Sequence, residues 1–125
     1  MTRLLFVAAG GAIGSALRYL VANAALTWLG PTFPWGTLAV NFAGSFLIGL
    51  VQSLATEGLV LGEDARLFLT TGVMGGLTTY SAFSYESFRY LHEGAWALAA
   101  TYIVTTVVGC LAGCAAGILV ARSLV

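Results

Sequence analysis

The sequence GVMGGLTTYSAFS, residues 72–84, lies inside a long apolar segment and is rich in residues that interrupt a helix. Its glycines, Gly72, Gly75 and Gly76, each weaken a helix by roughly 1 kcal/mol relative to alanine. The hydroxyl groups that follow can replace backbone hydrogen-bond partners lost at a break, and they belong to Thr78, Thr79 and Ser81. A broken helix is tolerated at membrane depth only where protein buries it or where it lines a watery path. Because its free carbonyls and its positive N-terminal dipole end form ion sites, this stretch predicts a membrane protein that handles ions.

The composition of the chain indicates that lipid is its main solvent. Hydrophobic residues make up 59% of the 125 residues and charged residues 8%, against roughly 25% charged in soluble domains. The length predicts one small domain over residues 1–125, and zero net charge gives no reason to expect nucleic acid as a partner. With His92 as the single histidine, we interpret Cys110 and Cys114 as small core residues, not as a disulfide framework or a metal site.

Four apolar stretches have the length of about 20 residues that a membrane span requires. They predict transmembrane helices over residues 4–29, 37–56, 66–91 and 95–120. The basic start of the first stretch is similar to a signal peptide, but its apolar run continues past Arg18 and is too long for one. The connections are predicted to be a Pro/Gly turn, a polar loop with three of the five acidic residues, and a last turn, at residues 30–36, 57–66 and 92–94.

The basic residues are all arginines, and they divide almost evenly between the two sides of a protein with four spans. One side would carry Arg3, Arg66 and Arg122, and the other Arg89 and Arg18. This bias is weak under the positive-inside rule. The chain could therefore insert in both orientations and form an antiparallel homodimer, or these few charges could set a single topology; the sequence leaves both open.

Small residues indicate where helices can approach closely in lipid. Gly10 and Gly14 form one GxxxG motif, and Gly109, Gly113 and Gly117 form a longer ladder in the last apolar stretch. Glycine is common in membrane helices. These motifs therefore predict tight helix packing and oligomer formation, and no particular chemistry.

Two groups of polar side chains lie within the apolar stretches. Asn41 follows Thr37 by about one helical turn, and a buried amide must either bridge helices or face a pore. Tyr102, Thr106 and Cys110 recur every four residues and so share one helix face. That face could form a track for a small ion; the alternative is that Thr106 donates a hydrogen bond to its own i−4 carbonyl.

Charged and aromatic residues within the stretches also have two interpretations each. Arg18 and Glu86 are candidates for function because intramembrane charges are costly, but Glu86 could pair with Arg89 and Arg18 could extend toward headgroups. Tyr80 and Phe83 share a helix face. They either pack against lipid and helices or present positive ring edges to an anion. Weakly polar ligands of this kind could bind an anion loosely enough to release it.

Together these motifs resemble the Fluc/CrcB family of fluoride channels. The resemblance covers nearly the whole chain, through GGAIGSALRY (10–19), GTLAVNFAGSFLIG (36–49), GVMGGLTTYSAFSYE (72–86) and the four-spaced polar face. It implies an all-α membrane protein with four transmembrane helices, the third broken mid-membrane, that forms an antiparallel, dual-topology homodimer with two pores. It also implies passive fluoride export across the bacterial inner membrane, which relieves fluoride toxicity.

The resemblance further implies roles for individual residues by position. The backbone carbonyls of Gly75 and Thr78 would hold a structural sodium ion at the dimer centre. The fluoride pore would be lined by Asn41, Tyr80, Phe83, Ser84, Tyr102, Thr106 and Cys110, and its vestibule by Arg18, Thr37 and Glu86. This chain departs from the family pattern at Tyr80, where phenylalanine is usual, and at Cys110, where a hydroxyl residue is usual. Tyrosine adds a donor and a steric demand, and a thiol is a weaker donor than a hydroxyl.

The implied function is a fluoride-selective channel and not an enzyme, and two other classes compete with it. A proton-coupled small multidrug exporter shares the four helices but needs an embedded acid in its first helix, and residues 4–29 contain no Asp or Glu. A non-transporting membrane partner or a lysis protein would not need a central asparagine, a polar helix face and a broken helix together. Fluoride efflux from liposomes separates the three classes.

Overall fold

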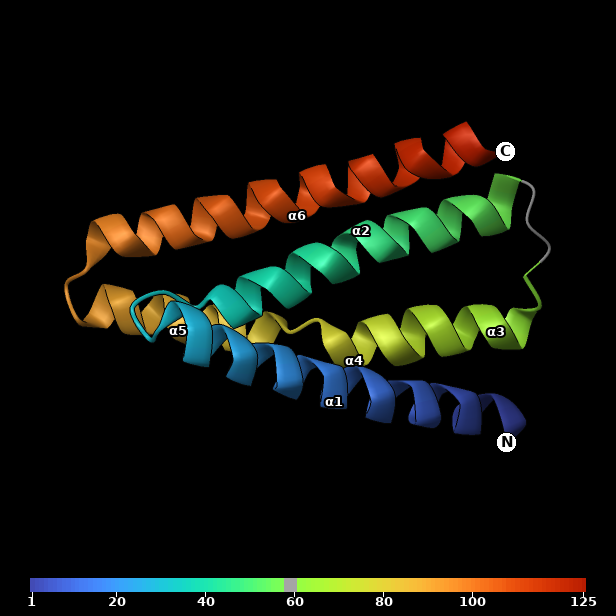
Figure 1. The fold of residues 1–125 in the computed structure, drawn as a ribbon, viewed down its shortest axis with the longest axis horizontal. Coiled ribbons are helices and arrows are strands. Elements are labelled where there is room, and N and C mark those ends of the chain that lie inside the picture. Colours follow the sequence, from blue (N-terminus) through green and yellow to red (C-terminus); the bar gives the residue numbers. More distant parts are fainter. Residues whose placement is uncertain (58–60) are drawn as a thin grey trace.

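The computed structural model describes residues 1–57 and 61–125, and this part of the chain is helical with no strand. The three long helices are α1 (Thr2–Leu29), α2 (Trp35–Glu57) and α6 (Trp96–Leu124). Between α2 and α6 lie α3 (Glu63–Leu67), the π-helical η1 (Phe68–Met74), α4 (Gly75–Leu77) and α5 (Tyr80–His92). Figure 1 shows both termini at one end of the molecule, together with the end of α2 and the start of α3.

Within the described ranges, three helices are long and apolar enough to cross a membrane, namely α1, α2 up to Thr56, and α6. Much of their apolar surface is exposed: Trp28, Leu111 and Val108 are 83%, 68% and 59% accessible. Because water would not stabilise so much exposed apolar area, these side chains face lipid or another protein surface. The predicted third span over residues 66–91 is not one continuous helix, because the backbone leaves the helical conformation between α4 and α5.

α2 and α6 pack closely through glycines where residues 46–50 of α2 meet residues 114–117 of α6. A Cβ atom on Gly117 would collide with the carbonyl oxygen of Phe46, and one on Gly49 would collide with the carbonyl oxygen of Cys114. Gly109 differs, since a Cβ atom there would lie 3.9 Å from the Phe42 ring, an ordinary contact. Close packing is thus confirmed at Gly117 and does not extend to Gly109, the start of the ladder. Gly113 is intermediate, because a Cβ atom there would lie 3.1 Å from the Phe42 ring.

The glycines of the opening motif do not break the helix, which corrects the prediction made from their low propensity. Gly72, Gly75 and Gly76 all lie in helical backbone within η1 and α4. Two of them let α1 approach, because a Cβ on Gly72 would lie 2.9 Å from Gly10 Cα and one on Gly76 2.5 Å from Gly11 O. Tight packing against α1 therefore outweighs the propensity cost of about 1 kcal/mol per glycine.

The break falls at the two threonines that follow. Thr78 has φ −76° and ψ 155°, and Thr79 has φ −150° and ψ 109°, so both are extended. β-Branched residues favour extended backbone, and Thr79 then caps α5 with its own side chain, which accepts a hydrogen bond from Ala82 N. The local sequence thus ends one helix and starts the next within two residues.

The connecting segments agree with the sequence where they are described. Gly30, with φ 80°, ends α1, and Gly94, with φ 75°, lies in the turn between α5 and α6. The predicted polar loop at residues 57–66 is in part helical, because α3 begins at Glu63, and residues 58–60 lie outside the described part. Arg3 pairs with Glu63 and also lies 3.5 Å from Asp64, which joins the starts of α1 and α3.

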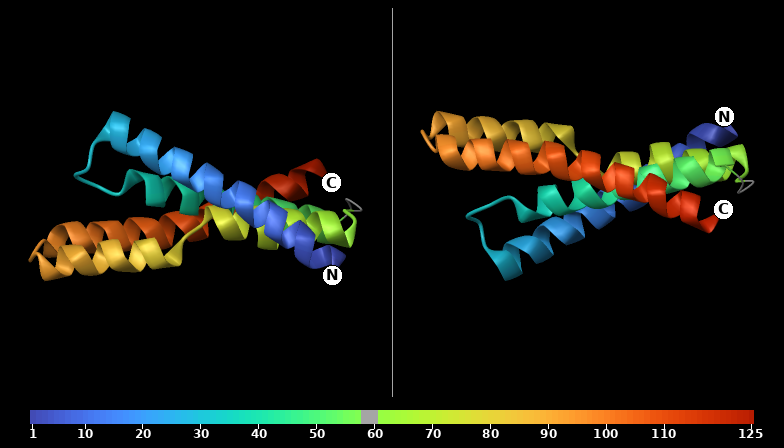
Figure 2. Two further views of the ribbon diagram at one scale, coloured as in Figure 1. Left: turned by 90° about the horizontal axis from the view of Figure 1, so that it is seen from below. Right: turned by 90° about the horizontal axis from the view of Figure 1, so that it is seen from above.

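α5 leans away from the first two helices. Figure 2 shows α5 and the N-terminal half of α6 running together, while the C-terminal half of α1 and the start of α2 diverge from them. The divergence begins near the break between α4 and α5, which therefore lies where the helices cross. The fold places the break at the centre of the molecule and opens cavities beside it.

Candidate functional site

The break is held by a reciprocal pair of hydrogen bonds from Asn41 on α2. The backbone N–H of Thr79 donates to Asn41 Oδ1 at 2.7 Å, and Asn41 Nδ2 donates to the carbonyl oxygen of Thr79 at 3.0 Å. Both residues are buried. A buried backbone group without a partner costs about 1–3 kcal/mol, so the amide replaces the helical partners that Thr79 lost. Asn41 therefore bridges two elements, and one N–H of its NH2 group is left for another acceptor.

The threonine hydroxyls at the break are also engaged. Thr78 Oγ1 donates to the carbonyl oxygen of Met74 at 3.0 Å, and Thr79 Oγ1 lies 3.3 Å from Ser81 Oγ in addition to capping α5. The positive end of the α5 dipole thus points toward the break. Sequence reasoning identified these hydroxyls but did not identify Thr79 as the cap of α5, although threonine is a residue typical of helix caps. It also missed the contact of Thr79 with Asn41, for which the sequence has no local signal.

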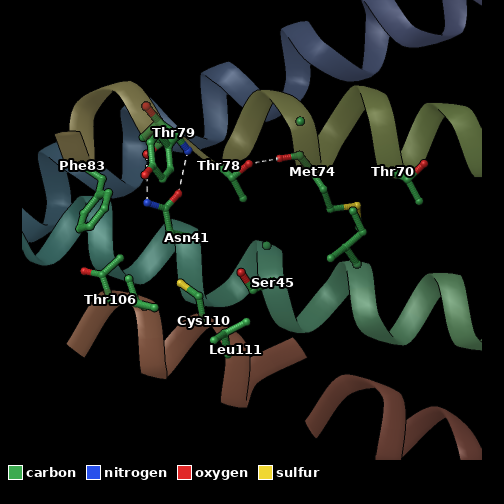
Figure 3. A pocket seen from close by; sticks show the side chains of 15 residues that line it. Asn41, Ser45, Thr70, Met74, Thr78, Thr79, Phe83, Thr106, Cys110 and Leu111 are labelled. Carbon is green, nitrogen blue, oxygen red and sulfur yellow. Dashed lines mark hydrogen bonds between the residues drawn. The ribbon is translucent and has the colours of Figure 1, made fainter. Parts of the chain in front are cut away.

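An open groove of about 460 Å³ runs beside the break, between α2, α6 and the η1–α4–α5 segment (Figure 3). Its lining is mainly apolar, with scattered hydroxyls, the Asn41 amide and a thiol. The predicted site residues that line it are Asn41, Gly75, Thr78, Tyr80, Phe83, Thr106 and Cys110. The groove also contains Thr70 and Ser45, which sequence reasoning did not select because single hydroxyl residues are common in membrane helices.

Thr106 has an unsatisfied, buried hydroxyl beside this groove. Its side chain is 5% exposed, and its Oγ1 has no hydrogen-bond partner among the described residues. The alternative in which Thr106 donates to its own i−4 carbonyl is therefore wrong. Buried polar atoms are satisfied in the great majority of cases, so an unpaired hydroxyl beside a cavity indicates a place for a polar ligand.

The two predicted pore aromatics differ in their surroundings. Phe83 is 8% exposed and its ring centroid lies 5.4 Å from that of Tyr102, whereas Tyr80 is 79% exposed. The rings of Tyr80 and Phe83 meet edge to face with centroids 5.6 Å apart. Phe83 is thus a fixed part of the wall of the groove, and Tyr80 lies at its open edge.

Glu86 on α5 is held by two hydroxyl groups from different helices. Thr37 Oγ1 on α2 donates to Glu86 Oε1 at 2.9 Å, and the Tyr102 hydroxyl on α6 donates to Glu86 Oε2 at 2.7 Å. The structure therefore joins Thr37 and Glu86, which were predicted for the vestibule, to Tyr102, which was predicted for the pore. Arg89 is not the partner of Glu86, since its Nε lies 4.0 Å from Glu93 Oε1. Tyr102 is turned to this cluster and does not line the groove with Thr106 and Cys110.

Two other predicted site residues lie apart from the groove. Arg18 lines a second cavity of about 430 Å³ together with Thr37, Thr79 and Glu86. Ser84 is exposed and donates to its own i−4 carbonyl, that of Tyr80, at 2.9 Å. The structure thus places Arg18 near the Glu86 cluster and leaves Ser84 outside the cavity that contains Phe83.

The carbonyls at the break meet one requirement of a sodium site. In a continuous helix the N–H of Thr79 would donate to the carbonyl of Gly75, but it donates to Asn41 instead. The Gly75 carbonyl is thereby released, and Gly75 is exposed on the groove. The described residues contain no cluster of three His, Cys, Asp or Glu side chains. Since hard cations take oxygen ligands, backbone carbonyls at this break fit the ion that the resemblance implies.

The fold and this site define a small, helical, multi-pass membrane protein with a mainly apolar groove, carrying scattered polar groups, beside a helix break. The chain belongs to the CrcB family, because the family model described as "CrcB-like protein, Camphor Resistance (CrcB)" matches residues 5–118.

Relatives of the same length carry a more specific name. The chain is similar to proteins named "Fluoride-specific ion channel FluC" from three bacteria. That of Anaeromyxobacter dehalogenans is 48% identical over 122 residues, which cover 98% of this chain and 97% of the relative. That of Agrobacterium fabrum is 48% identical over 124 residues and covers 99% of each chain, and that of Geobacter sulfurreducens is 45% identical with 99% and 100% covered.

Proposed function

We propose that this protein is a fluoride-selective channel that lets fluoride leave the cell passively and so relieves fluoride toxicity. The observation that carries the proposal is the groove beside the break, combined with full-length similarity to relatives named as fluoride channels. A channel must bind its ion loosely enough to release it. The groove offers only neutral groups for this: the remaining N–H of Asn41, the free hydroxyl of Thr106 and the ring edge of Phe83.

The proposed assembly is an antiparallel homodimer of chains that each cross the membrane four times. The third crossing is the segment from α3 to α5, which runs lengthwise beside the three long helices (Figure 1). Two observations support a second copy as the missing wall of the groove. The groove is open on one side, and exposed apolar residues such as Tyr80 and Leu111 lie on its rim. The near-even arginine distribution supports insertion in both orientations.

The sodium ion is proposed to lie between the two breaks of such a dimer, bound by the carbonyls of Gly75 and Thr78 from each chain. Its positive charge would offset the carbonyl ends of the interrupted helices. Thr78→Ser should be mild, because it leaves the backbone in place. Gly75→Val should be severe, although a Cβ there meets only Thr70 O at 3.8 Å within one chain, since the obstruction would arise against the second copy. Equal tolerance of both changes would contradict a sodium site made by backbone.

The cavity that contains Arg18, Thr37 and Glu86 is proposed as the vestibule of the pore. The Arg18 guanidinium would attract fluoride to this cavity. The Glu86 carboxylate, which accepts hydrogen bonds from Thr37 and Tyr102, would repel the anion and so prevent tight binding there. We place the protein in the bacterial inner membrane, as a multi-pass protein, on the basis of its bacterial relatives.

The test of this function is ion efflux from liposomes that contain the purified protein. We expect rapid loss of internal fluoride, measured with a fluoride electrode after the potential is released by an ionophore, and no comparable loss of chloride. Liposomes without protein set the background. Fluoride retention at the background rate would refute the channel, and equal loss of chloride would refute its selectivity.

The orientation has its own test. Reporter fusions at the C-terminus should show both orientations in one membrane, and two lysines added beside Arg122 should bias insertion to one side and lower the yield of dimer. A single orientation of the unmodified chain would exclude the antiparallel dimer.

A further inference from the structure

The two cysteines of α6 lie one turn apart in different surroundings. Cys114 packs against α2, where its Sγ lies 3.2 Å from the position that a Cβ on Gly49 would take. Cys110 lines the open groove and is half-buried. Both thiols are free, and Cys114 is half-buried as well. The chain therefore contains one thiol that faces the cavity and one that is packed between helices, with the same helix supporting both.

The groove beside Cys110 shows a second, independent sign that it takes a polar ligand. Thr106, one turn earlier on α6, lines the same groove and has a buried Oγ1 with no partner among the described residues. Figure 3 shows the Cys110 sulfur and the Ser45 hydroxyl directed into the space between α2 and α6. Since buried hydroxyls are normally satisfied by protein or water, the unpartnered Thr106 hydroxyl marks a place for a polar ligand one turn from Cys110.

We propose that Cys110 is a modification site at which a small thiol-reactive electrophile closes the groove. Thiols react as thiolates, and only where the reagent can reach the sulfur. With methyl methanethiosulfonate, the Cys110 thiolate attacks the methylthio sulfur, a new S–S bond forms, the S–S bond of the reagent breaks, and methanesulfinate leaves while the thiol proton goes to solvent. The closing effect rests on the proposed function, because it requires the groove to be the ion path.

The expected effect follows from the size and chemistry of the added group. A methylthio group extends the Cys110 side chain by two heavy atoms into a groove that Asn41 and Phe83 also line. It also removes the S–H, which is a weak donor, and leaves an apolar surface in its place. An anion in the groove must exchange its hydration water for weak hydrogen-bond donors. The methylthio group would occupy space and offer no donor, one turn from the free Thr106 hydroxyl.

The experiment treats the protein in liposomes with methyl methanethiosulfonate and measures two quantities. Intact mass and peptide mapping count the methylthio groups and locate them, and fluoride efflux is compared with the untreated rate of the same protein. We expect one group, at Cys110, and a fall in efflux of about tenfold or more, restored by dithiothreitol. Cys114→Ser should respond as the parent does, and Cys110→Ser should show neither labelling nor a change from its own untreated rate.

Three results would overturn the inference. Cys110 could remain unlabelled while the reagent is active on a control thiol, it could be labelled with efflux unchanged, or Cys110→Ser could still be inhibited. Failure of the proposed function looks different, because the untreated parent would then show no fluoride efflux. In that case, labelling of Cys110 and not of Cys114 would support the claim that the reagent reaches the Cys110 thiol alone. Labelling of both cysteines, or of neither, would refute that claim.

Discussion

The contact of α6 with α2 and the contacts of α5 with the rest of the molecule are made in different ways. α2 and α6 approach through glycines, so that a backbone carbonyl of one helix lies where a Cβ of the other would be. α5 leans away from α1 (Figure 2) and packs on α6 through an apolar core that contains Phe83, Tyr90 and Tyr102. Polar side chains hold it in addition: Asn41 at the break before it, and Thr37 and Tyr102 at Glu86. The first contact is a close steric approach at glycines, and the second combines apolar packing with side-chain hydrogen bonds.

This difference indicates which part of the molecule is scaffold and which part can meet an ion. A glycine contact leaves no room for water or ligand and satisfies no polar group, so it fixes the distance between two helices in lipid. The polar contacts keep cavities open on both sides of α5, since the groove with Phe83 and the cavity with Arg18 both border it. Substitutions in the two regions should therefore fail in different ways.

The largest effect is expected in the scaffold, at Gly117. Gly117→Ala places a Cβ against the carbonyl oxygen of Phe46, which is backbone and cannot turn aside, so α2 and α6 must separate. We expect a loss of more than about 3 kcal/mol in stability and little monodisperse protein, measured by size exclusion and by unfolding in detergent.

Gly109→Ala is the matched control, because its Cβ would lie 3.9 Å from the Phe42 ring in ordinary contact. Its yield and stability should stay close to those of the parent. Equal loss from both substitutions would show that the glycine spacing, and not the Phe46 contact, determines the packing.

The next largest effect is expected at the clamp on the break. Asn41→Ala leaves the buried N–H and C=O of Thr79 without their partners, which should cost about 2 kcal/mol or more and reduce fluoride efflux by about tenfold or more because the start of α5 is no longer fixed. Hydrogen exchange of the Thr79 amide should accelerate as well. Asn23→Ala, on the exposed surface of α1, controls for the loss of an amide. Unchanged exchange at Thr79 would contradict the clamp.

A smaller effect is expected at the Glu86 cluster. Tyr102→Phe removes the 2.7 Å hydrogen bond to Glu86 but keeps the ring that packs against Phe83, so stability should fall by about 1–2 kcal/mol with the fold intact. Tyr85→Phe, at a position 72% exposed, should be neutral. A double-mutant cycle with Glu86→Gln measures the coupling, and a coupling near zero would show that the Tyr102 hydroxyl is not bound to Glu86 in the membrane.

Much of the fold follows from the sequence, because length and hydropathy limit apolar stretches in lipid to helices. The break lies within the predicted stretch of residues 72–84, but the glycines do not make it. Propensity disfavours Gly72, Gly75 and Gly76, while the packing of two of them against α1 keeps that part of the segment helical. Hydrophobic pattern carries no information on contacts that glycines permit between distant helices. The break is instead made by the extended threonines, with a partner 38 residues earlier in the chain.

The candidate site was predictable in its residue types and less so in its pairings. Asn41 was selected because a buried amide needs partners, yet nothing local shows that its partner is the backbone of Thr79. Spacing placed Tyr102, Thr106 and Cys110 on one face, but Tyr102 binds Glu86 while the other two line the groove. One helical face can thus border a cavity at two positions and carry a buried, hydrogen-bonded side chain at a third, and only the arrangement of the neighbouring helices decides which residue does which.

Fluoride efflux from liposomes with the Phe83→Ile protein tests most directly whether the groove is the ion path. Phe83 is buried, and its ring lines the groove beside the break. Isoleucine keeps much of its apolar volume but has no positive ring edge to offer an anion. We predict that the variant elutes as the parent does, because the glycine contacts and the Asn41 clamp are unchanged, and that its efflux collapses, with Phe83→Tyr retaining more. A Phe83→Ile protein that folds and elutes normally and still conducts fluoride at the parent rate would contradict the account.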